Sequence, residues 1–307
     1  MPGMDFQLIL DEINDELRPQ LPRVGGKVAS YIPALARVSP QQFGIALRTC
    51  AGETAAAGDA AVPFSIQSMS KVFSLTLAIR ALGEAMWDRI GREPSGSPFN
   101  SLVQLESERG IPRNPFINAG AIAVADRLVS QGDALAELLA LLGRLCGEPV
   151  AIDAEVARSE AETGFRNTAL ANFMKAFGTM DNDVAEVLDV YFNQCALRMT
   201  CEQVACAAGY LCRDGRHPLA GTPVLSEAQT RRVNALMLTC GTYDAAGEFA
   251  FRIGLPCKSG VGGGIMAVVP DRLTLCVWSP ALDATGNSLL GRQALELFVA
   301  KTGLSVF

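Results

Sequence analysis

The sequence predicts a mixed α/β fold of the α+β type, in which an antiparallel sheet flanked by helices is interrupted by an inserted all-helical subdomain. Strand-like segments lie toward the two ends of the chain, within residues 42–66 and 264–278. Residues 67–222, between them, are mostly helical in pattern. Strands from both ends can share one sheet only if the helical region is inserted between them.

The domain organisation follows from this order of elements. The length of 307 residues suits one domain, 1–307, made of two subdomains in close contact. We expect residues 1–66 and 223–307 to form the sheet-containing subdomain and residues 67–222 to form the helical one. A cleft between the two subdomains is the natural place for a pocket.

The N-terminal elements are one helix and two strands. Residues 6–18 place apolar side chains on one face at helical spacing, which predicts an amphipathic helix. Residues 42–50 are strand-like, and a Gly/Ala-rich turn separates them from a second strand-like run at 61–66.

The helical region contains clear helix signals. Residues 134–143 form a Leu/Ala-rich helical pattern, and residues 183–197 repeat apolar side chains at helical spacing. Residues 200–203 and 226–229 both have the form of a capping box, in which a Ser or Thr and a Gln three positions later open a helix.

The C-terminal part returns to strands. Residues 264–269 and 273–278 flank the sequence Pro-Asp-Arg at 270–272, which predicts a hairpin turn. Residues 288–302 predict a closing helix, and Gly303 is the residue that stops it.

Composition excludes several partners and compartments. The net charge of −6 argues against binding to nucleic acid or to an anionic membrane surface. The N-terminus does not have the pattern of a signal peptide, and no apolar stretch reaches the roughly 18 residues that span a bilayer. We therefore expect a cytoplasmic protein.

The cysteines predict free thiols rather than a metal site. Nine cysteines are scattered along the chain without a Cys-x-x-Cys pair, which favours a reducing compartment. Cys195, Cys201, Cys206 and Cys212 cluster in sequence, but their spacing fits no zinc pattern. We expect them to be small core residues, and we expect no metal and no cofactor.

The motif that carries chemistry is Ser-Met-Ser-Lys at residues 68–71. Positions three apart share a face of a helix, so the Ser68 hydroxyl and the Lys71 amine can meet. The chain has a single histidine, His217, in a segment that predicts a turn, so a Ser-His-Asp triad would depend on it alone. Lysine is the better candidate base, since burial or a nearby cation can lower its pKa.

A second motif supports the first. Residues 258–264, Lys-Ser-Gly-Val-Gly-Gly-Gly, lead directly into a predicted strand. A Lys-Ser/Thr-Gly run downstream of Ser-x-x-Lys resembles the layout of the serine β-lactamases and penicillin-binding proteins. Residues 301–303, Lys-Thr-Gly, also match, but they end the last predicted helix and are interpreted as structural.

The blocks around these motifs resemble the serine-dependent glutaminases, which share the β-lactamase-like fold. The matching blocks occur in family order over about residues 24 to 270. They are residues 26–33, 64–73, 112–121, 159–160, 166–167, 191–192 with 194–195, 240–247 and 254–264.

The resemblance implies an activity and a mechanism. It implies a β-lactamase/transpeptidase-like fold, with the whole chain as one glutaminase catalytic domain. Ser68 would attack the side-chain amide of L-glutamine, and Lys71 would take its proton. Ammonia would leave, and water would hydrolyse the γ-glutamyl ester on Ser68 to glutamate.

The resemblance also implies the remaining site residues and the assembly. Tyr191 and Tyr243 would shuttle protons, and the backbone N–H groups of Ser68 and Val261 would hold the oxyanion. The family commonly forms homodimers or homotetramers. The substrate-binding set would be Tyr31, Ser68, Asn118, Glu160, Asn167, Tyr191, Tyr243 and Val261.

The chemistry of free glutamine agrees with these assignments. A carboxylate such as Glu160 suits the α-ammonium, and the amide donors of Asn118 and Asn167 suit the α-carboxylate. Taken singly, each of these residues also has an ordinary structural explanation, as a solvated charge or a turn residue. The ordered set favours the functional interpretation.

Three alternatives stay open on the residues alone. The first is a β-lactamase or peptidoglycan carboxypeptidase, since residues 191–193 mimic a Tyr-x-Asn element of such enzymes. The second is a non-catalytic amino-acid sensor on the same fold. The third is an amidase for asparagine or another γ-glutamyl amide.

Overall fold

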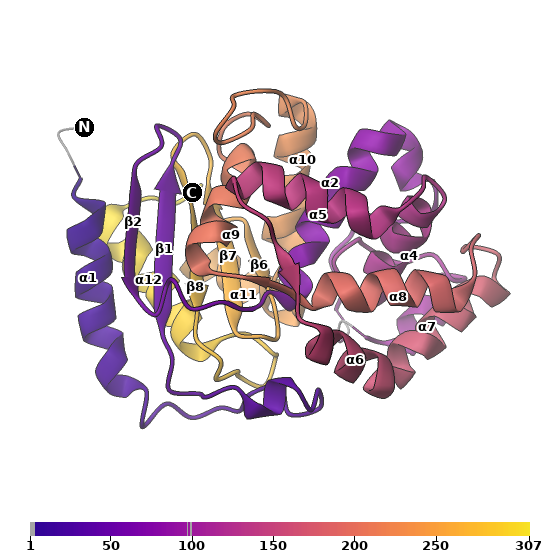
Figure 1. Cartoon of the computed structure of the whole chain (residues 1–307), viewed down its shortest axis with the longest axis horizontal. Coiled ribbons are helices and arrows are strands. Elements are labelled where there is room, and N and C mark those ends of the chain that lie inside the picture. The colour runs from indigo at the N-terminus through magenta and orange to yellow at the C-terminus, as the bar shows by residue number, and fades with distance from the viewer. Residues whose placement is uncertain (1–3, 97, 99) are drawn as a thin grey trace.

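A five-stranded antiparallel sheet forms one half of the molecule (Figure 1). The computed structural model describes residues 4–96, 98 and 100–307. The strands are in the order β2-β1-β8-β7-β6, so the N-terminal hairpin is joined to the C-terminal strands through β1 and β8. Their bounds are β1 Gly44–Thr49, β2 Thr54–Gly58, β6 Cys257–Ser259, β7 Gly264–Val269 and β8 Leu273–Trp278.

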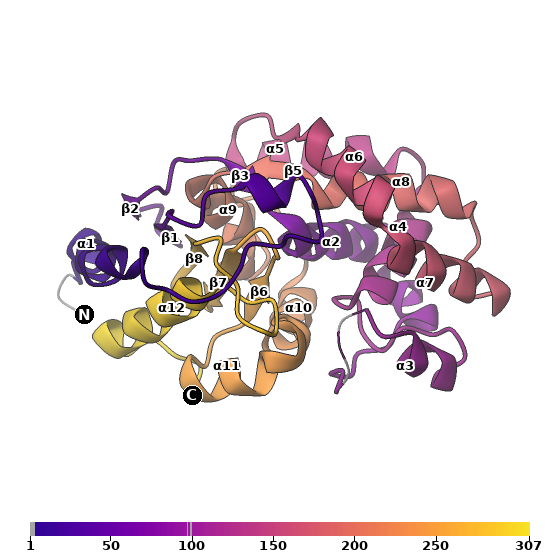
Figure 2. The same ribbon diagram turned by 90° about the horizontal axis from the view of Figure 1, so that it is seen from below.

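Helices cover both faces of this sheet. The N-terminal helix α1 (Phe6–Leu17) packs beside the C-terminal helix α12 (Leu289–Thr302) on one face, with α11 (Ala246–Arg252) nearby (Figure 2). The opposite face packs against α9 (Cys201–Ala207) and the helical part of the chain. The sheet is therefore buried on both sides.

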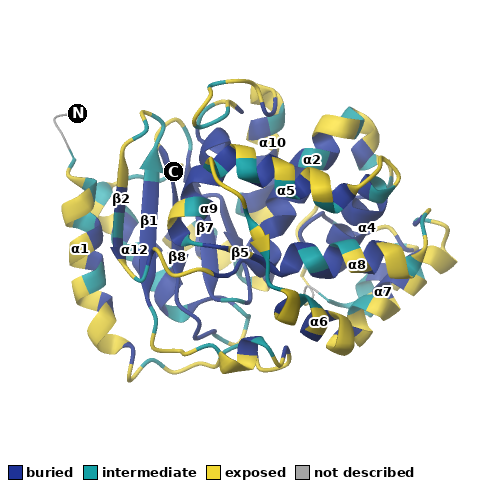
Figure 3. Cartoon of the chain, in the orientation of Figure 1, coloured by how far each residue is buried: buried dark blue, intermediate teal, exposed yellow. Residues whose placement is uncertain are grey.

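The strand sequences explain this double burial. In β7, Ile265 and Ala267 face the core formed with α1 and α12, while Met266 and Val268 face the core formed with the helical part. Successive side chains of a strand point to opposite faces, so a continuous apolar run supplies both cores at once. Figure 3 shows the central strands dark blue and the outward faces of the peripheral helices yellow.

The other half of the molecule is a cluster of helices. A small three-stranded sheet, β3 (Phe64–Ser65), β5 (Leu197–Met199) and β4 (Ala151–Ile152), lies where the halves meet. The α-helices of this half, with the adjoining α10, are α2 Ser70–Leu82, α3 Leu102–Ser107, α4 Asn118–Val129, α5 Ala134–Cys146, α6 Ala154–Thr163, α7 Phe165–Ala176, α8 Val184–Cys195 and α10 Glu227–Cys240. Short 3-10 helices are η1 Arg18–Gln20, η2 Leu35–Arg37, η3 Gln67–Met69, η4 Gly83–Arg89, η5 Ala208–Leu211 and η6 Tyr243–Ala245.

Most of the predicted elements are present. Both capping boxes are formed, at Thr200 with Gln203 and at Ser226 with Gln229. The predicted C-terminal strands coincide with β7 and β8, and Gly303 ends α12 in a left-handed conformation. Within the part of the chain that the structure describes, no helix is long and apolar enough to cross a bilayer.

One predicted strand is wrong. The partner of β1 is β2, at residues 54–58, in the segment expected to be a Gly/Ala-rich turn. Of the predicted strand 61–66, only Phe64 and Ser65 are extended, and they pair with β5 in the small sheet. Three alanines have weak strand propensity, but pairing with β1 and packing under α1 make them a strand.

A glycine-rich loop joins the two halves at close range. Residues 260–263 lie against the backbone of residues 65–67: a Cβ added at Gly262 would be 2.2 Å from the Ser65 carbonyl oxygen, and one at Gly260 would be 2.4 Å from the Ile66 oxygen. The indole Nε1 of Trp278 donates to the Gly262 carbonyl oxygen at 3.0 Å and anchors the loop to the sheet. Only glycine permits this approach.

We predict that Gly262→Ala lowers the urea midpoint of unfolding, because the new methyl group must push two backbone segments apart, at a cost of about 1–3 kcal/mol. Gly247→Ala in α11 is the matched control, since a methyl group added there would have no neighbouring atom within 4 Å. The control should keep the wild-type midpoint. Equal midpoints for both variants and the wild type would contradict the close contact.

Candidate active site

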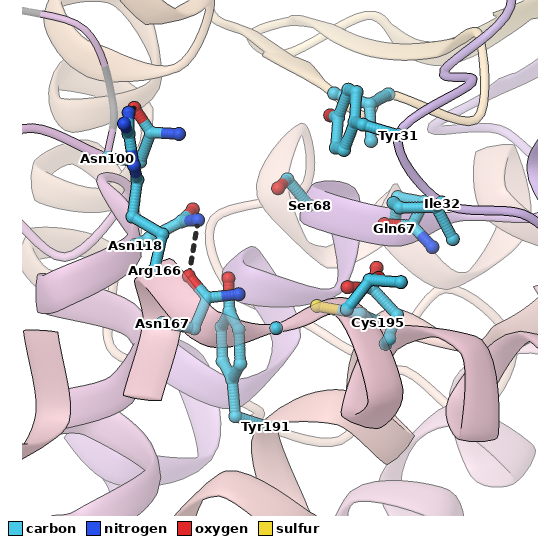
Figure 4. Close-up of a pocket in the computed structure, with 14 residues that line it drawn as sticks. Tyr31, Ile32, Gln67, Ser68, Asn100, Asn118, Arg166, Asn167, Tyr191 and Cys195 are labelled. Carbon is cyan, nitrogen blue, oxygen red and sulfur yellow. Dashed lines mark hydrogen bonds between the residues drawn. The ribbon is translucent and has the colours of Figure 1, made fainter. Parts of the chain in front are cut away.

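A pocket lies between the glycine-rich loop and the helical half. Its wall combines residues from the N-terminal segment, the η3 turn, α4, α6, α7, α8 and the loop after β6 (Figure 4). The lining residues are Tyr31, Ile32, Gln67, Ser68, Asn100, Asn118, Glu160, Thr163, Gly164, Arg166, Asn167, Tyr191, Cys195 and Val261.

Ser68 lies in the η3 turn, directly before α2 begins at Ser70. It is only 7% exposed, and Figure 4 shows its side chain turned into the pocket. The preceding residue, Gln67, has a φ of +50°, an unusual conformation for a residue other than glycine. Such strain persists only where the surroundings enforce it, and here the glycine-rich loop packs on this turn.

Lys71 lies behind the pocket wall, one turn along from Ser68, and is wholly buried. Its Nζ donates to the Asn118 Oδ1 at 2.7 Å and to the Phe116 carbonyl oxygen at 3.2 Å. Both partners are neutral oxygens. Burial lowers the pKa of the Lys71 amine to about 8, because the charged form loses its hydration.

Tyr243 and Lys258 form a buried group beside Ser68. The Tyr243 hydroxyl donates to the Ser259 carbonyl oxygen at 3.3 Å, and the Ser68 side chain acts to lower the pKa of Tyr243. The Lys258 Nζ lies 4.8 Å from the centre of the Tyr243 ring and donates to the carbonyl oxygens of Gly241 and Ser259 at 3.0 and 2.7 Å. Tyr243 has a φ of +61°, so its backbone, like that of Gln67, is held in a strained conformation.

Burial raises the pKa of both site tyrosines. Tyr191 projects from α8 with its hydroxyl toward the pocket, and the Lys71 Nζ lies 5.8 Å from its ring centre (Figure 4). Loss of hydration raises the pKa of Tyr191 and of Tyr243 well above the ordinary value for a phenol. Both side chains are therefore neutral hydroxyl groups at physiological pH.

Glu160 supplies the acidic group of the pocket. It lies on α6 and is 7% exposed. Burial raises the pKa of the Glu160 carboxyl to about 7, and the Gln67 side chain and the Lys71 charge oppose that rise. A cationic ligand group in the pocket would favour the ionised form.

An amide pair from α4 and α7 forms another part of the pocket wall. The Asn118 Nδ2 donates to the Asn167 Oδ1 at 2.9 Å, as the dashed line in Figure 4 shows. Because Asn118 also accepts from Lys71, it links the buried amine to the pocket wall. Tyr31 is at the rim, 59% exposed.

The structure brings the sequence-predicted residues together, in two layers. Ser68, Tyr31, Asn118, Glu160, Asn167, Tyr191 and Val261 line the pocket, whereas Lys71 and Tyr243 lie beneath its wall. Val261 is held next to the serine turn because Gly260 and Gly262, on either side of it, contact residues 65–67. The catalytic and binding roles of these residues remain predictions.

Sequence reasoning missed other pocket residues. Gln67 donates to the Ser65 hydroxyl at 3.0 Å and helps to lower the pKa of Glu160, and no sequence pattern signals its left-handed backbone. Cys195 was expected to be an ordinary core residue, but its sulfur lies on the pocket wall. Its place four residues after Tyr191 puts both on one helix face, which is a signal the sequence did contain.

His217 is not among the residues that line the pocket. The His217 Nδ1 accepts from the backbone N–H groups of Leu219 and Ala220 in a turn, as its sequence predicts. Among the described residues, no three His, Cys, Asp or Glu side chains are grouped so that they could hold a metal ion.

Comparisons with known proteins identify the family of this chain. The sequence model of the glutaminase family matches residues 26–307. A glutaminase of Agrobacterium fabrum is 58% identical, over 99% of this chain and 99% of that protein.

Solved structures give the same result. A probable glutaminase, ybaS, superposes with a TM-score of 0.91 at 38% identity, covering 98% of both chains. A probable glutaminase from Bacillus subtilis, complexed with 6-diazo-5-oxo-L-norleucine, superposes with a TM-score of 0.88 at 36% identity, over 100% of this chain and 99% of that one. Such coverage and identity, together with the Ser-Lys pocket, show that this chain belongs to the glutaminase family.

Proposed function

We propose that the protein hydrolyses L-glutamine to L-glutamate and ammonia through a γ-glutamyl ester on Ser68, with Lys71 as the general base. The observation that carries this proposal is the buried Lys71 amine, which lies one helical turn from Ser68 on the pocket wall. The amine donates hydrogen bonds only to neutral oxygens. The family membership supports glutamine as the substrate.

The pKa shifts favour Lys71 as the base. A base must be unprotonated at the working pH, and burial lowers the pKa of Lys71 to about 8. Tyr191 and Tyr243 are shifted in the opposite direction, so neither can act as a phenolate, although their hydroxyl groups can relay protons. Glu160 serves better as the partner of a substrate cation.

The hydrogen bonds of Lys71 fit the neutral amine. A neutral amine has two N–H donors and one lone pair. The Asn118 and Phe116 oxygens accept the two donors, which leaves the lone pair to receive the Ser68 proton, directly or through a tyrosine hydroxyl. This arrangement leaves the neutral amine with a lone pair that can accept a proton.

A competing nucleophile is disfavoured by its environment. Cys195 is also on the pocket wall, but burial raises the pKa of its thiol to about 12. The nucleophilic form of cysteine is the thiolate, which is then scarce at neutral pH. Ser68 has a base one turn away and needs no ionisation of its own before the reaction.

The pocket groups suit the two ends of free glutamine. The Glu160 carboxylate would bind the α-ammonium, and the amide groups of Asn118 and Asn167 would bind the α-carboxylate, with Tyr31 at the rim. The γ-amide would then reach Ser68. Glutamine bound in this way spans from the helical half to the glycine-rich loop.

The chemical steps follow from this orientation. Ser68 Oγ attacks the γ-carbonyl carbon, and the backbone N–H groups of Ser68 and Val261 stabilise the oxyanion. The ammonium form of Lys71 gives its proton to the amide nitrogen, the C–N bond breaks, and that nitrogen leaves as ammonia. Water, deprotonated by Lys71, then hydrolyses the ester and frees glutamate.

We also retain the predicted organisation as part of the proposal. Residues 1–66 and 223–307 would form one subdomain and residues 67–222 the other, within a single catalytic domain. A homodimer or homotetramer is supported by large exposed apolar side chains such as Phe165 and Phe251, and light scattering decides it. All nine cysteines are described and unpaired, which supports the cytoplasm as the compartment.

We predict that Ser68→Ala lowers ammonia release from glutamine by about 10⁴-fold or more without unfolding the protein, because the nucleophile is lost. Lys71→Ala should lower it by about 10²–10⁴-fold, as expected for a general base. Ser70→Ala is the matched control: Ser70 is buried and lies off the pocket wall, and its hydroxyl has no hydrogen-bond partner among the described residues. Its activity should stay within about tenfold of the wild type.

The same assay tests the substrate. The wild type should release ammonia far faster from glutamine than from asparagine, whose carbonyl group ends one methylene short of Ser68. Full activity in the Ser68 variant would refute the mechanism. Rapid hydrolysis of nitrocefin with no ammonia from glutamine would favour a β-lactamase, and binding of glutamine without any hydrolysis would favour a sensor.

The pH profile of kcat/KM should rise in two steps. The pH dependence of kcat/KM gives the pKa values of the essential ionising groups in the free enzyme. Lys71, with a pKa of about 8, and Glu160, with a pKa of about 7, must both lose a proton before the reaction. We therefore expect kcat/KM to rise steeply below pH 7, about tenfold per unit between pH 7 and 8, and to level off above.

Glu160→Gln should remove the lower step and raise KM by roughly 30-fold or more, because it removes the partner of the α-ammonium. Glu155→Gln, on the same helix but exposed, should keep both steps. A profile that is flat from pH 6 to 9 in the wild type would contradict both assignments.

A further inference from the structure

Two cysteine thiols that the catalytic mechanism does not use lie against each other. The Cys50 and Cys212 sulfur atoms are 2.9 Å apart, and the Cys50 thiol is also within 3.1 Å of the Cys212 carbonyl oxygen. Cys50 follows β1, and Cys212 follows η5 in the helical half. Residues distant in sequence are thus paired in space.

The backbone holds this pair in place. The Cys50 N–H donates to the Arg272 carbonyl oxygen at 2.7 Å, and the Asp271 N–H donates to the Cys212 carbonyl oxygen at 3.0 Å. Both cysteines are therefore tied to one β7–β8 hairpin turn. A disulfide needs its two sulfur atoms at about 2.05 Å, so the pair must approach by less than 1 Å.

We propose that Cys50 and Cys212 form a reversible disulfide when the enzyme meets a hydroperoxide, and that this bond clamps the sheet to the helical half.

The surroundings make Cys50 the reacting thiol. Cys50 is partly exposed, whereas Cys212 is 2% exposed. A hydrogen bond with the Cys212 thiol lowers the pKa of Cys50, and the Arg213 charge adds to this effect. Burial and the charges of Asp271 and Asp214 oppose it, but the pKa of Cys50 stays below its ordinary value. The buried partner is placed as the resolving thiol.

The reaction balances with a hydroperoxide, ROOH, as the oxidant. The Cys50 thiolate attacks the terminal peroxide oxygen, the O–O bond breaks, and the alkoxide leaves as ROH, which gives a sulfenic acid on Cys50. The Cys212 sulfur then attacks the Cys50 sulfur, the S–O bond breaks, and hydroxide leaves as water with the Cys212 proton. Two thiols lose two electrons, and the peroxide gains them.

The position of the pair predicts stabilisation without loss of activity. The disulfide would close a loop through residues 51–211, which restricts the unfolded chain strongly. The pair is at the turn that ends β7, whereas Val261 precedes the start of β7, and the strand between them is six residues and about 20 Å long. The clamp therefore does not touch the pocket.

A second cysteine pair provides the control. Cys146 is also partly exposed, but its thiol donates to the carbonyl oxygens of Leu142 and Glu148 at 3.1 and 3.3 Å, and Cys206 points at the Leu145 carbonyl oxygen. These thiols face backbone oxygens instead of each other. Cys146→Ser thus removes an accessible thiol without removing the proposed bond.

The test treats the full-length protein with hydrogen peroxide, blocks remaining thiols with N-ethylmaleimide, and maps peptides by mass spectrometry without reduction. We expect a peptide linking residues 50 and 212 in the wild type and in Cys146→Ser, and none in Cys50→Ser or Cys212→Ser. Oxidation should raise Tm by on the order of 5 °C in the first two proteins, and dithiothreitol should reverse it. Ammonia release should change by less than about twofold.

Three results would overturn the proposal. One is sulfenic or sulfinic acid on Cys50 with no linked peptide. Another is an equal rise in Tm in the Cys50→Ser variant, and the third is loss of ammonia release that follows the linked peptide. If Cys212→Ser does not fold, Cys50→Ser alone decides, since Cys50 is partly exposed and the substitution replaces only its sulfur atom.

Discussion

The complete burial of Lys71 is the constraint on which the rest of the site depends. An amine in water near neutral pH is protonated and useless as a base, and only loss of hydration brings its pKa close to the working range. The helical half encloses this amine, and Asn118 and Phe116 take its N–H groups. The same exclusion of water raises the pKa of Tyr191 and Tyr243. Burial therefore makes the amine easier to deprotonate and the two phenols harder to deprotonate.

The glycine-rich loop places the sheet against the turn that contains Ser68. A lysine and a serine on one helix could meet in many proteins, but here the sheet delivers Val261 to the serine turn through backbone contacts that allow no side chain at Gly260 or Gly262. Gln67, in this contact, and Tyr243, whose hydroxyl donates to the Ser259 carbonyl oxygen, both have a strained backbone. The double-faced sheet sustains such strain, because β7 and β8 are buried against two separate cores and cannot shift to relieve it.

Sequence patterns predicted the elements whose signals are local. The apolar runs around Pro270 predicted two strands, and the capping boxes at Thr200 and Ser226 predicted two helix starts. All of these are present in the structure. The strand β2 escaped prediction because its alanines become a strand only through β1 and α1. The burial of Lys71 and the left-handed Gln67 were equally hidden, since neither residue type favours its environment and both are imposed by distant parts of the chain. Ser68 and Lys71 were predicted from the local Ser-x-x-Lys pattern, whereas the other site residues were predicted only through resemblance to a family.

The measurement that tests the account most directly is the pKa of the Lys71 amine in the free enzyme. The chain has only five lysines, so ¹³Cε-labelled lysine gives a spectrum that Lys71→Ala can assign. The account predicts a Lys71 resonance that titrates near pH 8, well before those of the exposed lysines. Titration of Lys71 near 10.5, the ordinary value for lysine, would mean that the amine is protonated at working pH and would contradict the mechanism.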